Sequence, residues 1–146
     1  METLSFEIII DAPKEKIWNV LWSPETYPVW TKPFCEGSHI ESDWKVDGKT
    51  YFLDGNNEGM VSTIDSFEEP TQVVFKHLGN YSNGKEDTES MEVKQWSGAF
   101  EKYFIIPMED NVNKLHVEIQ TEKNYVDMMN NSFHKGLEIV KKLSEQ

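Results

Sequence analysis

The chain begins with the hydrophobic pattern of a strand and ends with that of a helix. Apolar and polar residues largely alternate over 3–10, and this period of two predicts a half-buried strand. Pro13 suits the first position of a helix, and the apolar spacing over 13–22 predicts a short helix there. Ser23 is placed to cap a second short helix that ends near Trp30.

The middle of the chain repeats strands and turns, which favours an antiparallel sheet of about six strands. Turn residues such as Asp-Gly and Asn-Asn separate the strands, because they tolerate positive φ. The predicted strands include 50–53, 59–67, 72–77, 99–106 and 114–120. The predicted turns are 46–49, 54–57 and 107–113, and 79–84 is a predicted loop that the acidic run 86–92 continues.

The final segment changes to a period near 3.6 and predicts one long amphipathic helix over about 124–144, capped by Asn124. Its apolar stripe is Val126, Met129, Phe133, Leu137 and Val140. An amphipathic helix has to cover a sheet, so the order of elements predicts an α+β fold. In this arrangement a curved antiparallel sheet of about six to seven strands wraps around the C-terminal helix, with two short helices after the first strand.

Composition narrows the function classes. The 146 residues fit a single domain spanning 1–146. All 14 basic residues are lysines and the net charge is −12, which argues against a nucleic-acid partner. No stretch reaches the ~20 apolar residues of a membrane span, and the start of the chain does not resemble a signal peptide. With Cys35 as the single cysteine, we expect a cytoplasmic protein without an internal disulfide.

Several short motifs carry a family resemblance. They are Ala12-Pro13, Ile17-Trp18, Leu21, Trp30, Trp44 to Gly48, Gly59, Val61, Phe67 to Pro70, and Lys135 to Leu137. In this order they resemble the proteins similar to the activator of the heat-shock protein 90 ATPase. That family belongs to the START/birch-pollen-allergen-like (SRPBCC) superfamily. The resemblance extends over nearly the whole chain, and its motifs are mostly structural. The segment from Phe75 to Tyr103 looks like one bacterial subgroup.

The resemblance implies a helix-grip fold with an interior pocket for an apolar or aromatic small molecule. It also implies a possible role as the partner of a chaperone. One departure concerns the last helix, where many relatives carry a Gly-Trp pair and this chain has Ser132-Phe133-His134-Lys135. Because this segment would form the floor of the pocket, a relative's ligand is not carried over.

Candidate chemistry is sparse. The four histidines, His39, His77, His116 and His134, do not show the spacing of a metal site, and no nucleophile or phosphate-loop motif occurs. We therefore expect no metal, no cofactor and no catalytic group. His116 alternates outward with polar neighbours. His77 shares a face with apolar residues, where it is either a hydrogen-bonded core histidine or a polar group that orients a ligand.

Aromatic residues make up 12% of the chain and are the strongest positive signal. Most of them are expected to fill the core, because each buries ~150–250 Å². A subset on inward strand positions and on the last helix would line the pocket. These candidates are Phe52, Met60, Phe75, His77, Tyr103, Phe104, Met129, Phe133 and Leu137.

Three functions follow from these patterns. The first is non-enzymatic binding of a small apolar or aromatic molecule in a cavity between the sheet and the C-terminal helix. The second is docking on a chaperone or another protein, with a homodimer as one form of it. The third is a cyclase or hydrolase that uses the same cavity, for which His77 and Tyr103 are the available acid and base groups.

Overall fold

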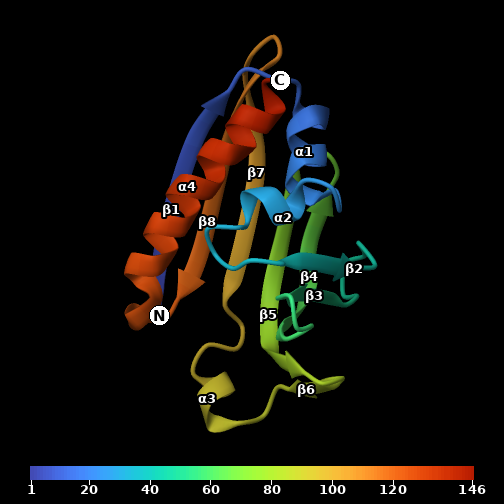
Figure 1. Ribbon diagram of the computed structural model, residues 1–146, viewed down its shortest axis with the longest axis vertical. Coiled ribbons are helices and arrows are strands. Elements are labelled where there is room, and N and C mark those ends of the chain that lie inside the picture. The colour runs from blue at the N-terminus through green and yellow to red at the C-terminus, as the bar shows by residue number, and fades with distance from the viewer.

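One antiparallel sheet carries all the strands of the protein, and the computed structural model describes residues 1–146 (Figure 1). The strands are β1 (Glu2–Ile10), β2 (His39–Ser42), β3 (Thr50–Leu53), β4 (Gly59–Glu68), β5 (Gln72–Ser82), β6 (Lys85–Asp87), β7 (Phe100–Glu109) and β8 (Val112–Thr121). The helices are α1 (Lys14–Trp22), α2 (Tyr27–Trp30), α3 (Met91–Lys94) and α4 (Val126–Ser144), with a 3-10 turn at Lys123–Tyr125.

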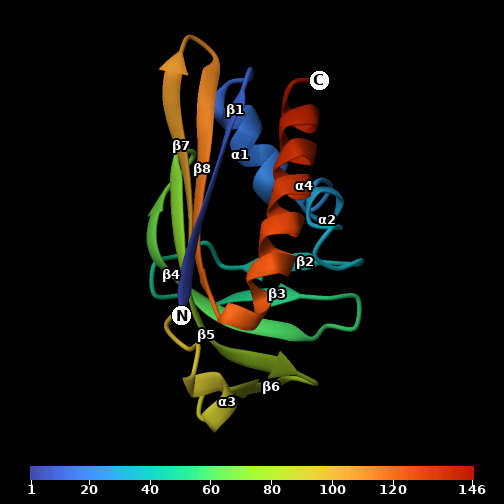
Figure 2. The ribbon, with the colours of Figure 1, turned by 90° about the vertical axis from the view of Figure 1, so that its left-hand side faces the viewer.

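The strand order is β1-β8-β7-β5-β4-β3-β2, and β6 pairs with β5 beside this path. Helices α1, α2 and α4 all lie on one face of the sheet, here called the inner face, and β2 to β5 curve beneath the lower end of α4 (Figure 2). This is the helix-grip fold that the sequence predicts, with eight strands in place of the expected six to seven.

Strand register determines which side chains reach the inner face. Phe6 pairs with Val117, Val117 with Tyr103, and Tyr103 with Val73, so these four side chains form one row across four strands. Val117, Tyr103 and Val73 are at most 2% exposed. The alternation predicted for 114–120 is confirmed, because every second residue of that segment is buried.

Helix α4 packs closely against the segment that contains α2. Gly136 lies at this contact, where a Cβ atom would be only 2.9 Å from the Trp30 carbonyl oxygen. Ser132, one turn earlier, donates a hydrogen bond of 3.1 Å to the Pro33 carbonyl oxygen. Phe133 stacks on Phe6 of β1 with ring centroids 4.9 Å apart. Helix α4 is therefore held by the α2 segment on one side and by β1 on the other.

Two predicted connections are wrong, because the strands are longer than the pattern suggests. The predicted loop 79–84 belongs mainly to β5, and the turn is confined to Asn83 and Gly84, both with positive φ. Gly79 allows this extension, since a Cβ atom there would lie 2.0 Å from the Asp87 carbonyl oxygen of β6. Likewise, β7 and β8 cover most of 107–113, and an irregularity after Pro107 accommodates the proline.

The start of the last helix also differs from the prediction. Asn124 is not the N-cap but lies within the 3-10 turn, and α4 begins at Val126 without a side-chain cap. Asp127 in the first turn and Lys141 in the last turn carry the charges that favour the helix dipole. The acidic run 86–92 does not form one loop, because it includes the end of β6 and the start of α3.

Candidate functional site

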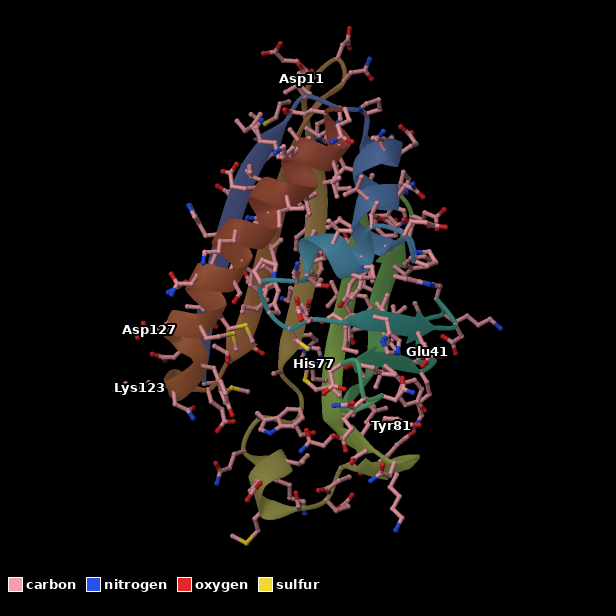
Figure 3. All side chains as sticks on the ribbon, viewed as in Figure 1. Asp11, Glu41, His77, Tyr81, Lys123 and Asp127 are labelled. Atoms are coloured by element: carbon pink, nitrogen blue, oxygen red, sulfur yellow. The ribbon has the colours of Figure 1, made fainter.

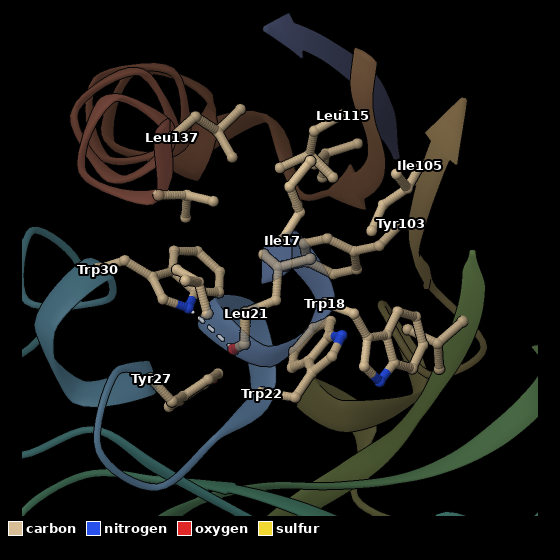
Figure 4. Packing of buried hydrophobic residues seen from close by; sticks show 14 of the residues in the cluster. Ile17, Trp18, Leu21, Trp22, Tyr27, Trp30, Tyr103, Ile105, Leu115 and Leu137 are labelled. Atoms are coloured by element: carbon tan, nitrogen blue, oxygen red, sulfur yellow. Dashed lines mark hydrogen bonds between the residues drawn. The ribbon is translucent and has the colours of Figure 1, made fainter. Parts of the chain in front are cut away.

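Aromatic rings fill the upper half of the inner face, which is the half nearer the C-terminus in the view of Figure 1. Trp22 is central, and its nearest ring is that of Tyr103 at a centroid distance of 4.8 Å. Phe75 lies 5.5 Å and Trp44 5.7 Å from the same indole. Figure 4 shows Trp22 and Tyr103 packed with Ile17 and Leu21 of α1 between the helices and the sheet. Most aromatic residues are therefore core residues, as the composition suggests.

The helices cover the lower half of the inner face, the half nearer α3 in the view of Figure 1, less completely. Phe52 of β3 and Met60 of β4 pair directly and are both half-buried. Met129, in the first turns of α4, is also half-buried, whereas Phe133 and Leu137 further along α4 are each 3% exposed. His77 lies between the first turns of α4 and β3 in the view of Figure 3. The core thus becomes more accessible towards this end.

A chain of polar side chains crosses the inner face at this level. The Ser62 hydroxyl lies 2.6 Å from His77 Nδ1, and His77 Nε2 lies 3.0 Å from Glu101 Oε1. The Tyr103 hydroxyl donates a hydrogen bond to the other oxygen of Glu101. These four residues, Ser62, His77, Glu101 and Tyr103, are called the His77 cluster below.

Strand pairing explains why the cluster forms. A register shift after Val61 places Ser62 directly opposite His77 on β5. On the other side of β5, Phe75 pairs with Glu101 of β7, so the Glu101 side chain projects to the same face as His77. The His77 backbone is fixed as well, since its N–H donates to the Ala99 carbonyl at 2.8 Å. The cluster is therefore held by the sheet and not by a loop.

Hydrogen-bond geometry assigns the tautomer of a neutral His77. If Nε2 carries the hydrogen, it donates to Glu101 while Nδ1 accepts from the Ser62 hydroxyl. The opposite tautomer would place a bare nitrogen against the Glu101 carboxylate, which is unfavourable. Ser62 is 0% exposed, so its hydroxyl orients the ring and is not presented as a nucleophile. Glu101, whose side chain is 16% exposed, is the most exposed member of the cluster.

The environment keeps two nearby phenols protonated. Burial raises the pKa of Tyr103 well above its ordinary value, and the negative charge of Glu101 raises it further. Burial also raises the pKa of Tyr27, again with a contribution from Glu101. Both side chains are therefore neutral at physiological pH. A phenolate acting as a base is not available here, whereas Tyr103 can serve as a hydrogen-bond donor.

The structure places eight of the nine predicted pocket residues on the inner face or on the side of α4 that faces it. Phe52, Met60, Phe75, His77 and Tyr103 come from β3, β4, β5 and β7, and Met129, Phe133 and Leu137 from α4. Phe104 is the exception. It pairs with His116 on the outer face, at a ring distance of 6.1 Å, because its neighbours Tyr103 and Ile105 point inward.

Sequence reasoning missed Ser62 and Glu101. The signal for Glu101 was present, since it is two residues from Tyr103 and shares its face in a strand. A charged residue on an otherwise apolar face is unusual, and here it marks the cluster. No comparable signal existed for Ser62, because the register shift that brings it opposite His77 is not visible in the sequence.

Other features of the surface do not suggest a site. One hollow is lined by Met1, Gln95, Glu122, Lys123 and Asn124, and another by residues of the last turns of α4. Both are lined mainly by polar or charged side chains and are distinct from the His77 cluster. No group of three or more His, Cys, Asp or Glu side chains is arranged to hold a metal ion. None of the helices has the length and hydrophobicity needed to cross a bilayer.

The family model described as "Activator of Hsp90 ATPase homolog 1-like protein" matches residues 11–138. The chain belongs to this family. The resemblance seen in the sequence is thereby confirmed, together with the helix-grip fold that it implies. No functionally curated protein is similar enough in sequence to count as a match.

Solved structures share the fold at low sequence identity. The Aha1 dimer from Colwellia psychrerythraea is 18% identical with a TM-score of 0.73, and the match covers 99% of this chain and 97% of that one. A protein from Mesorhizobium loti is 12% identical with a TM-score of 0.70, covering 97% and 96% of the two chains. Another from Mycobacterium smegmatis is 16% identical with a TM-score of 0.68, covering 97% and 89%.

Proposed function

We propose that this protein binds a small molecule with an apolar or aromatic body at the lower half of the inner face, without catalysing its conversion. The ligand's body would lie against Phe52, Met60 and Met129, and its polar end would contact Glu101. The observation that carries the proposal is the His77 cluster. A hydrogen-bonded carboxylate on a mostly apolar inner face, with its side chain 16% exposed, can orient a ligand.

The surroundings of the cluster support this function. The Phe52 ring lies 5.0 Å from Phe75 and 5.5 Å from His77, so an aromatic wall adjoins the polar groups directly. Methionines adapt to ligands of different shape, and Met60 and Met129 are both half-buried at this end. Ligand binding between sheet and C-terminal helix is also in keeping with the fold family.

A neutral fluorescent dye, N-phenyl-1-naphthylamine, tests the location of binding. Phe52→Ala removes half of the proposed aromatic wall, and we expect it to weaken dye binding about tenfold or more. Phe104→Ala is the matched control, because Phe104 is also a half-buried strand phenylalanine but lies on the outer face. It should change dye affinity less than about twofold. Equal effects of the two variants, or no dye binding at all, would contradict the proposal.

Native mass spectrometry of freshly purified protein provides a second test. A bound molecule would add mass that disappears on denaturation, and its formula would identify the ligand class. We expect that mass to be reduced in a Met129→Ala variant. A ligand retained equally by Met129→Ala and Phe52→Ala would place the binding site elsewhere.

Docking on another protein is the second candidate. It is favoured by the family's description, which names an activator of the Hsp90 ATPase, and by the description of the Colwellia relative as a dimer. The net charge of −12 would attract a basic partner surface in the cytoplasm, where we expect the protein to act. Sedimentation equilibrium tests the homodimer, and stimulation of a bacterial Hsp90 ATPase tests the chaperone role. A monomer without effect on the ATPase would remove this candidate.

A further inference from the structure

We propose that the polar end of the ligand is a cation, a protonated amine whose ammonium group binds Glu101. This inference rests on the proposed function and specifies the chemical class of the ligand. It follows from three features of the His77 cluster. These are its negative charge, its hydrogen-bond donors that are already engaged, and its aromatic neighbours.

The first feature is a negative charge without a lysine partner. The only side chain that forms an ion pair with Glu101 is His77, and the other partner of Glu101, the Tyr103 hydroxyl, is uncharged. Lys102, the next residue on β7, points to the outer face and pairs there with Glu118 at 3.5 Å. Lys76, the neighbour of His77 on β5, also alternates away from the inner face. An ammonium group from a ligand would therefore meet a carboxylate that no lysine neutralises.

The second feature is that the donors of the cluster are already used. His77 donates through Nε2 to Glu101 and accepts through Nδ1 from Ser62, while the Tyr103 hydroxyl donates to Glu101. A carboxylate or phosphate ligand would find no free N–H or O–H in the cluster and would be repelled by Glu101. Each oxygen of Glu101 accepts one hydrogen bond from the cluster and retains acceptor capacity, which an ammonium group with its three donors can use.

The third feature is the ring environment. The Phe52 ring is half-buried and lies 5.5 Å from the His77 ring, and the faces of aromatic rings attract cations. The buried Tyr27 and Tyr103 remain neutral because burial and the charge of Glu101 raise their pKa values, so neither phenol carries a negative charge at physiological pH. A half-buried aromatic ring next to the cluster that holds this carboxylate favours an organic cation over a neutral or anionic group.

Three probes with the same phenylethyl body separate charge from shape. They are phenethylamine, 2-phenylethanol and 3-phenylpropionate, each used to displace N-phenyl-1-naphthylamine at neutral pH and low salt. We expect the amine to bind about tenfold more tightly than the alcohol, and the carboxylate to bind more weakly than both. An alcohol or carboxylate that binds as tightly as the amine overturns the inference.

Glu101→Gln tests whether this carboxylate is responsible. The variant should bind phenethylamine and 2-phenylethanol within about threefold of each other, with affinity for the alcohol unchanged. Glu118→Gln, on the outer face of β8, is the matched control and should keep the full preference for the amine. Retention of the preference in Glu101→Gln overturns the inference. If Glu101→Gln does not fold, the comparison of the three probes on the unmodified protein still decides the question.

The outcomes distinguish this inference from the function on which it rests. Dye binding that depends on Phe52 but not on Phe104 supports the proposed function whatever the charge of the ligand. If the dye binds in this way and phenethylamine does not displace it in preference to the alcohol, only the cation inference fails. If Phe52→Ala and Phe104→Ala affect the dye equally, the proposed function itself fails.

Discussion

Trp22 and Trp30 face each other edge to face across the junction of α1 and α2, with ring centroids 6.4 Å apart. Only one of the two indoles has a hydrogen bond. Trp30 Nε1 donates to the Leu21 carbonyl oxygen at 2.9 Å, as Figure 4 shows, whereas the buried Trp22 Nε1 has no partner. Leu21 is in the last turn of α1, so Trp30 satisfies one of the carbonyls that every helix end leaves free.

Substitution of each tryptophan by phenylalanine isolates that hydrogen bond. Trp30→Phe should lower the free energy of unfolding by about 1–3 kcal/mol more than Trp22→Phe, because it leaves the Leu21 carbonyl buried and unpaired. Both variants remove similar volume from the same cluster, which makes each the control of the other. Urea unfolding followed by circular dichroism measures the difference. Equal losses would mean that the bond contributes nothing.

The second prediction rests on the close contact between Gly136 and the Trp30 carbonyl. Alanine is favoured over glycine in a helix by about 1 kcal/mol, so Gly136→Ala would ordinarily stabilise α4. Here the new Cβ atom would meet a backbone oxygen at 2.9 Å and the Trp30 ring at 3.3 Å. Since overpacking costs about 1–3 kcal/mol, we expect a net loss of stability.

Thermal unfolding checks the Gly136→Ala prediction. A net loss of about 1 kcal/mol would lower the Tm by about 2–4 °C for a domain of this size. Lys135→Ala, at the adjacent exposed position of α4, should leave the Tm nearly unchanged. A higher Tm for Gly136→Ala would show that α2 and α4 can separate at little cost.

The third prediction concerns the tautomer of His77. Nitrogen-15 NMR should detect hydrogen on Nε2 of the neutral ring, because Ser62 donates to Nδ1 and Glu101 accepts from Nε2. Ser62→Ala removes the donor and leaves Nδ1 without its partner in a buried site, at a cost of about 1–3 kcal/mol.

The matched control for Ser62→Ala is Ser97→Ala, since the Ser97 hydroxyl donates to a carbonyl in an exposed position. That variant should change the free energy of unfolding by less than about 0.5 kcal/mol. A neutral His77 with hydrogen on Nδ1 would contradict the assignment. Equal free energies of unfolding for Ser62→Ala and Ser97→Ala would also contradict the assignment.

The sequence predicted the fold well because the fold depends on periodicity. The alternation over 114–120 and the 3.6 period of the last helix are properties of the local sequence, and both are confirmed. The His77 cluster was predicted only in part, since it depends on register between strands. The pattern could not show that Ser62 faces His77 or that Phe104 lies on the other face. It also could not show that a missing Cβ atom at Gly79 allows β5 to continue.

The last prediction concerns an ionisable group outside the inner face. The Tyr51 hydroxyl donates to Glu86 at 2.6 Å, and Lys49 contacts the other oxygen of Glu86 at 2.5 Å. The hydrogen bond to Glu86, together with burial and the nearby charge, raises the pKa of Tyr51 to about 12. Lys49, and then Tyr51, lower the pKa of Glu86 below its ordinary value.

These shifts determine how the contact depends on pH. A raised Tyr51 pKa stabilises the folded state fully below the unfolded value of 10, and that contribution is lost as the pH rises through about 12. The lowered pKa of Glu86 stabilises the folded state at pH values above the ordinary pKa of 4.5. That contribution is lost as the pH falls through the lower pKa of Glu86 in the folded state. The stabilisation from this contact should therefore be constant between roughly pH 5 and 10.

Glu86→Ala tests the cause of the shift. Titration of tyrosine absorbance should show one phenol that ionises closer to pH 10 in the variant than in the unmodified protein, because its acceptor and the neighbouring negative charge are gone. Glu89→Ala removes an exposed carboxylate from the same acidic run and should leave the Tyr51 titration unchanged. A titration curve that is the same in Glu86→Ala and in the unmodified protein would mean that burial alone keeps Tyr51 protonated. The hydrogen bond to Glu86 and the charge of Glu86 would then have no effect on the pKa of Tyr51.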